Sequence, residues 1–156
     1  MPSLTLQNDD FANLVILLAR LFLSLPFLYS GIDKLGRWTA AQSEVAASGL
    51  PWPTLLHVVT VLVQILGGLS VLIGIEARLG ALALCLFLIP VTVLYHPFWK
   101  RSGPDRIAEA DHLLLNFAVI GGLLIVVVLG SGRFSLVDQS VLTLVEKVVA
   151  FVGATR

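Results

Sequence analysis

The residues best suited to bind a ligand are three histidines, each near the end of a different apolar segment: His57, His96 and His112. An imidazole donates or accepts a hydrogen bond and is a common metal ligand. Together with Tyr95 and Asn116 nearby in the sequence, the histidines predict a pocket in which a quinone head group finds hydrogen-bond partners. The alternative is that each histidine lies separately at a membrane interface. No two histidines have the spacing of ligands on one helix, so no metal site is predicted.

A second polar group lies inside the first apolar segment. Arg20 falls within residues 13–32, and a charged side chain at the centre of a membrane helix costs at least ~2.5 kcal/mol unless it faces other helices or water. Ser24 shares the helical face of Arg20, and Gln64 has a similar predicted depth in the next segment. We interpret Arg20, Ser24 and Gln64 as a polar clasp between the first two segments. A site for an anion or another ligand around Arg20 is the alternative.

The elements that must hold these side chains are apolar helices. Of 156 residues, 57% are hydrophobic and 13% are charged, and the mean hydropathy is +0.94. These values exclude an ordinary soluble domain, and a net charge of zero offers no basic surface for nucleic acid. Four segments are long enough to cross a bilayer: 13–32, 55–74, 78–95 and 112–130. We therefore predict an all-α integral membrane protein, a bundle of four transmembrane helices with short interfacial helices.

Helical periodicity predicts the buried side of each span. In the first span one face carries Asn13, Arg20, Ser24, Phe27, Gly31 and Lys34. In the second span one face carries His57, Thr60, Gln64, Gly68 and Val71. The connection 33–54 contains a capping-box pattern, Thr39 with Gln42, which predicts a short helix near the interface.

The two chain ends are predicted to differ from the 13–133 transmembrane domain. Residues 1–12 form a polar N-terminal tail. Residues 134–156 contain only about 14 apolar positions, interrupted by Glu146 and Lys147, which is too short for a span. This segment is expected to be an interfacial helix or a docking segment for another subunit.

The sequence contains no familiar catalytic pattern. It has no GxSxG, CxxC or HExxH motif, and a single cysteine, Cys85, excludes an intrachain disulfide. None of the four predicted spans contains a carboxylate, which argues against a proton relay or a small-solute transporter. We therefore do not expect an enzyme from this chain alone.

Several motifs in order along the chain resemble the DoxX family of small bacterial membrane proteins. They are residues 20–23 (RLFL), 29–35 (YSGIDKL), 67–69 (GGL), 72–74 (LIG), 95–99 (YHPFW) and 130–136 (GSGRFSL), together with Asn116, Gly121 and Gly122. Gln64 stands where the family pattern has an acid, and Leu115 where it has a lysine. The resemblance implies a four-helix bundle in the bacterial inner membrane and an association with oxidoreductase systems.

The expected function is that of an accessory or anchoring subunit in a larger, redox-linked membrane assembly, with other membrane proteins as partners. No cofactor is expected in the chain alone. The alternative is a membrane oxidoreductase component that binds quinone between His57, His96 and His112.

Overall fold

The computed structural model of the chain describes residues 10–135, and all of its regular elements are helices. They are α1 (Asp10–Gly36), α2 (Trp38–Ala47), α3 (Pro53–Leu62), the π-helical turn η2 (Val63–Gly67), α4 (Gly68–Ile73), α5 (Ala77–Tyr95), the 3-10 turn η3 (Phe98–Lys100) and α6 (Gly103–Leu129). Four helical stretches are long and apolar enough to cross a membrane: Asp10–Gly36, Pro53–Ile73, Ala77–Lys100 and Gly103–Leu129. The predicted all-α fold with four spans is confirmed.

The predicted faces of the first two spans are the buried ones. In α1 the buried residues are Asn13, Arg20, Ser24, Phe27 and Gly31, with Lys34 partly buried. The second span buries His57, Val61, Gln64, Gly67, Gly68 and Val71, with Thr60 partly buried. A polar stripe on a membrane helix therefore marks the side that packs against other helices.

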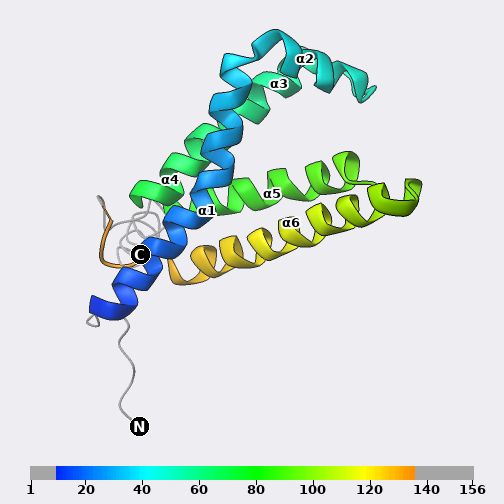
Figure 1. The fold of residues 1–156 in the computed structure, drawn as a ribbon. Helices are drawn as coiled ribbons and strands as arrows, with labels where there is room; N and C mark the ends of the chain where they lie inside the picture. The colour runs from blue at the N-terminus through cyan, green and yellow to red at the C-terminus, as the bar shows by residue number, and fades with distance from the viewer. Residues whose placement is uncertain (1–9, 136–156) are drawn as a thin grey trace, which may run out of the picture.

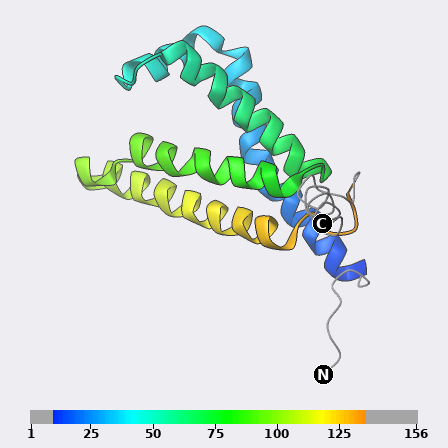
Figure 2. The ribbon, with the colours of Figure 1, turned by 180° about the vertical axis from the view of Figure 1, so that it is seen from behind.

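The helices form two arms that meet at one end and diverge at the other. The first arm contains α1, α2 and the continuous helix α3–η2–α4, and the second arm contains α5 and α6 (Figure 1). The view from behind shows the same divergence (Figure 2). We call the junction, where α4 leads into α5 and α6 ends, the closed end, and the opposite end the open end. Among the described residues, α3 makes no extensive contact with α5 or α6.

The apolar core lies where the arms meet. It consists of Phe27, Val71, Ala77, Ala81, Leu84, Cys85, Leu88, Leu123 and Val126. Small residues allow the helices to approach closely there. A Cβ atom on Gly67 would lie 2.9 Å from Leu84 Cγ, and one on Gly122 would lie 2.7 Å from Leu23 Cδ2. The side chains at the junction are therefore packed without room for larger residues.

The short helix of the first connection forms, but not by the predicted capping box. α2 begins at Trp38, and its N-cap residue Arg37 makes no side-chain capping bond. Gln42 Nε2 instead donates to Thr54 Oγ1 over 2.7 Å, which ties α2 to the start of α3. Arg37 also forms ion pairs with Asp33 and Glu44, and hydrogen bonds to these carboxylates raise the pKa of Arg37.

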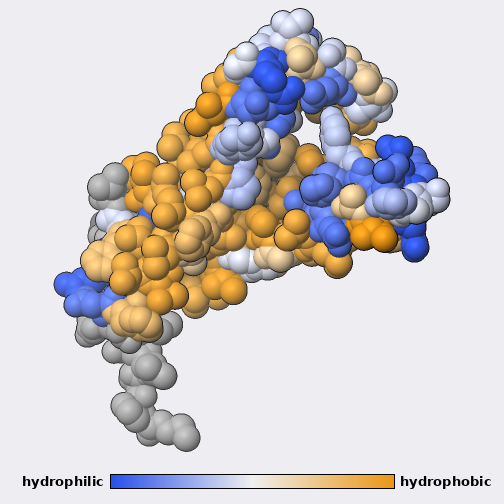
Figure 3. Space-filling model, in the orientation of Figure 1, coloured by the Kyte–Doolittle hydropathy of each residue, from blue (hydrophilic) through white to orange (hydrophobic). Residues whose placement is uncertain are grey.

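The fourth helix begins before the predicted span 112–130. α6 starts at Gly103, because Pro104 suits the first turn of a helix and Asp105 is favourable at its N-terminus. The polar first turns of α6 extend beyond the apolar stretch. Figure 3 shows hydrophilic residues at the far end of each arm and a mainly hydrophobic surface between them. The predicted C-terminal helix lies almost wholly outside the described residues.

Candidate functional site

The closed end is built around Arg20, whose side chain is fully buried. Arg20 Nε donates to Val71 O over 2.8 Å and Nη2 donates to Leu72 O over 2.6 Å. Nη1 donates to the carbonyls of Ser131 and Phe134, both over 2.7 Å. The guanidinium therefore joins α1 to the last turn of α4 and to the segment after α6. The free carbonyls of a helix C-terminus carry partial negative charge, so they stabilise a cation without a carboxylate.

The predicted pairing of Arg20 with Gln64 is wrong. Gln64 Nε2 donates to Ser30 Oγ over 3.2 Å, and Gln64 Oε1 has no hydrogen-bond partner. Ser24 Oγ donates to Leu21 O within its own helix, over 2.9 Å. The two spans run in opposite directions, so equal residue counts from their starts do not place two side chains at the same depth. Arg20 is a clasp between the first two spans, but its partners are backbone carbonyls.

Two further contacts complete the closed end. Asn13 Oδ1 accepts a hydrogen bond of 2.8 Å from the backbone N–H of Arg133. Gly74 has a φ of +83°, and a Cβ atom there would lie 2.6 Å from Arg20 Nη2. Glycine is needed at this turn both for its backbone conformation and for the space that the guanidinium occupies.

The structure divides the three histidines between the arms. His57 is fully buried in the first arm, where its ring makes an edge contact with Trp38 at a centroid distance of 4.4 Å. In the second arm, His96 and His112 stack with their ring centroids 5.1 Å apart. His96 Nδ1 lies 2.9 Å from Glu109 Oε2.

The predicted pocket of three histidines is therefore not formed. His57 belongs to α3, which diverges from α5 and α6 at this end. The second arm does bring several of the other predicted residues together. Asn116 Nδ2 donates to Thr92 Oγ1 over 3.0 Å, whereas Tyr95 is 41% exposed. The sequence did not indicate the pairing of Glu109 with His96.

A polar seam lies between α1 and α3–η2 in the first arm, and sequence reasoning missed it as a unit. Lys34 Nζ donates to Ser30 Oγ over 2.5 Å, and Gln64 donates to the same oxygen. His57 lies two turns from Gln64 on the same face, and neither nitrogen of its ring has a hydrogen-bond partner in the described part of the chain. The predicted shared faces of the two spans contain Lys34, Gln64 and His57, but not Ser30.

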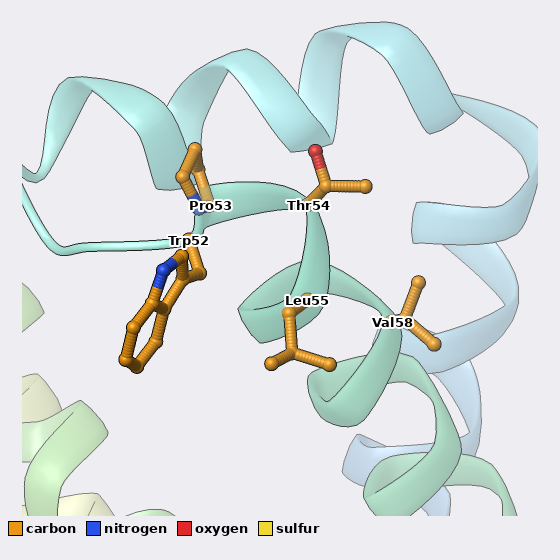
Figure 4. A pocket seen from close by; sticks show the side chains of 5 residues that line it. All are labelled: Trp52, Pro53, Thr54, Leu55 and Val58. Carbon is orange, nitrogen blue, oxygen red and sulfur yellow. The ribbon is translucent and has the colours of Figure 1, made fainter.

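The open end also contains an apolar groove at the start of α3. Its volume is about 710 Å³, and it is lined by Trp52, Pro53, Thr54, Leu55 and Val58. In Figure 4 the side chains of Trp52 and Leu55 point away from α2 and toward the side on which the second arm passes. The groove is therefore a hollow in the wall of the first arm, facing the space between the arms.

No group of three or more metal-ligating side chains occurs within residues 10–135. The candidate site residues that the structure describes are thus hydrogen-bonding side chains. Arg20 and its partners lie at the closed end, and the histidines lie toward the open end.

Comparisons with known proteins agree with this architecture. The chain is 23% identical to the inner membrane protein YphA of Escherichia coli over 85% of this chain and 96% of that protein. It is 27% identical to the inner membrane protein YqjF of the same organism, over 78% of this chain and 88% of that protein. No solved structure matches the chain.

The family comparison covers most of the first arm and all of α5. The DoxX family model matches residues 15–97, which is more than half of the chain. With four membrane-spanning helices and these relatives, the chain is a multi-pass inner-membrane protein. It belongs to the DoxX family.

Proposed function

We propose that this protein is a subunit of a larger membrane assembly and that a transmembrane helix of a different protein packs between its two arms at the open end. The observation that carries the proposal is the divergence of the arms, which leaves α3 without extensive contact to α5 or α6 among the described residues. A helix surface in a bilayer gains little from hydrophobicity alone, so shape and packing decide what covers it.

The unequal burial of the helices supports the proposal. Only 11% of the most apolar stretch of α6 is buried, against 39% of the corresponding stretch of Ala77–Lys100. On α6, Leu114, Leu115 and Phe117 are each more than half exposed. Within residues 10–135, these apolar side chains of the fourth span near the open end thus remain largely uncovered.

The groove on α3 supplies the wall that belongs to the first arm. Trp52 is 74% exposed and Leu55 is 56% exposed, although both are large apolar residues. Exposed aromatic residues beside a hollow are typical anchors of protein interfaces. The groove and the exposed side chains of the second arm are both mainly apolar, which is the character that a membrane helix between the arms requires.

Site-specific photocrosslinking in native membranes tests this proposal. A photoreactive amino acid replaces Leu55 in the groove, and a control variant carries it at Phe22, which lies on α1 about 200° around the helix from Arg20. We expect the Leu55 variant to form a crosslink to one protein of defined mass and the Phe22 variant to form none. Crosslinks from Leu55 only to lipid, or only to a second copy of this chain, would overturn the proposal.

A second candidate function is the binding of a quinone head group at the end of the second arm. It is favoured by the close approach of His96, His112 and Glu109, which presents imidazole nitrogens beside a carboxylate. Quinone extracted from the purified protein and from its His112→Ala variant tests this candidate. Equal amounts in both preparations, or quinone in neither, would exclude it.

A further inference from the structure

The polar seam of the first arm contains buried groups that the proposed function does not use. His57 is fully buried and Gln64 is 6% exposed. Both ring nitrogens of His57 and the Oε1 atom of Gln64 have no hydrogen-bond partner among residues 10–135. Burying a polar atom without a hydrogen-bond partner is unfavourable, so such groups rarely stay unpaired.

The direction of Lys34 makes the seam more polar. Near the end of a membrane helix, a lysine side chain ordinarily extends toward the interface. Lys34 instead turns back along α1, where its ammonium group donates to Ser30 Oγ over 2.5 Å. No ion pair among the described residues includes Lys34. The ammonium group of Lys34 thus lies about one helical turn deeper in the seam than the end of α1.

Contacts between the two helices place these groups in one column. A Cβ atom on Gly31 would lie 3.3 Å from Gln64 Cβ, which sets Gln64 level with this turn of α1. The contact of His57 with Trp38 sets the histidine level with the far end of α1. Lys34 therefore lies between the levels of His57 and Gln64, because the helices are antiparallel.

The helix itself is irregular at the deeper end of the column. Gln64 lies in the π-helical turn η2, Val63–Gly67. Such turns inside an α-helix are rare and are frequently found at functional sites. Below Gln64 the polar groups give way to Phe27 and Val71, which are 4% and 0% exposed and belong to the apolar core.

We propose that the seam between α1 and α3–η2 binds ordered water that enters at the open end and reaches Gln64, forming an aqueous half-channel closed by Phe27 and Val71. Water fits this seam because it both donates and accepts hydrogen bonds. A neutral His57 ring needs a donor for one nitrogen and an acceptor for the other, and Gln64 Oε1 needs a donor. A buried water typically makes about three hydrogen bonds to otherwise unpaired groups. This inference does not depend on what packs between the arms.

Water-edited solid-state NMR of the protein in lipid bilayers tests the inference. Magnetisation transfer from water is compared for the ring nitrogens of His57, for those of the exposed His112, and for the methyl groups of Val71. We expect transfer to His57 to be nearly as fast as to His112 and several-fold faster than to Val71. Transfer to His57 as slow as to Val71 would overturn the proposal.

Two variants of Gln64 connect the signal to the seam. Gln64→Leu removes the amide that holds the deepest water, so we expect transfer to His57 to slow markedly. Gln64→Glu keeps an oxygen acceptor at the same place, so we expect transfer to stay fast. Equal transfer in both variants would show that the water seen at His57 does not extend along the seam. The unchanged signal of His112 serves as the control for folding in each case.

Discussion

Buried polar groups in two regions of this molecule differ in their hydrogen bonding. At the closed end, the three nitrogens of Arg20 donate to four backbone carbonyls, and the surrounding chain is packed too tightly for a Cβ atom at Gly74. In the polar seam, which runs from the open end toward the junction, His57 and Gln64 are buried with atoms that lack partners among the described residues. The comparison teaches that a charged group in a membrane protein need not mark the site of function. The fully hydrogen-bonded arginine joins helices, whereas the buried neutral groups without partners are the basis of the proposed water site.

Replacing Arg20 is the change expected to have the largest effect. Arg20→Ala removes four hydrogen bonds from a charged donor and leaves the carbonyls of Val71 and Leu72 without these partners. We expect a loss of at least about 3 kcal/mol in the free energy of unfolding, measured in bicelles, since each such bond contributes roughly 1.5–3 kcal/mol. Arg20→Lys retains the charge but not the planar fork, so its loss is intermediate. A matched change at the exposed Lys100 is expected to have little effect. An Arg20→Ala protein as stable as the wild type would show that Arg20 does not stabilise the closed end.

Gly74→Ala tests the packing of the closed end with a single methyl group. The residue has a φ of +83°, and the added Cβ would lie 2.5 Å from Ser135 Cβ. We expect a loss of about 2 kcal/mol from the left-handed backbone and the collision together. Gly121→Ala is the matched control, because nothing lies within 4 Å of its added Cβ. The free energy of unfolding, measured in bicelles for both variants, should show Gly121→Ala to be neutral or slightly stabilising. Equal losses at both glycines would mean that the turn at Gly74 is not packed as described.

The smallest expected effect lies within the second arm. Asn116→Ala removes the hydrogen bond to Thr92 Oγ1, while Thr92 keeps its own bond to Leu88 O over 2.7 Å. Interhelical hydrogen bonds in membrane proteins contribute about 0.6 kcal/mol on average. A double-mutant cycle of Asn116→Ala with Thr92→Val should give a coupling energy of about that size. A coupling of several kcal/mol would show that α5 and α6 depend on this pair as strongly as the closed end depends on Arg20.

The sequence predicted the faces of the helices better than the arrangement of the helices. The stripe from Asn13 to Gly31 is buried as periodicity indicates, because a polar residue in a span can avoid lipid only by facing protein or water. The same argument correctly placed His57 and Gln64 on the buried side of the second span. Composition and the four long apolar segments predicted the membrane and the number of spans, and the family comparison confirmed the resemblance.

The partners of the polar side chains could not be predicted in the same way. Arg20 binds carbonyls of residues 71, 72, 131 and 134, and a backbone carbonyl has no signature in the sequence. The three histidines lie toward one end of the protein, but the divergence of the arms separates His57 from the other two. Divergence depends on how side chains pack at the junction, which periodicity does not describe.

Distances between spin labels at the two ends test the central claim most directly. In a Cys85→Ala background, one labelled pair replaces Leu55 and Ile107 at the open end, and another replaces Leu18 and Leu129 at the closed end. All four side chains are more than 40% exposed, so labelling does not disturb the core. For the purified protein in nanodiscs, diverging arms predict a short, narrow distance distribution for the closed-end pair and a clearly longer distance for the open-end pair. An open-end distance as short as the closed-end distance would show a closed bundle, and it would contradict both the division into two arms and the place proposed for a partner helix.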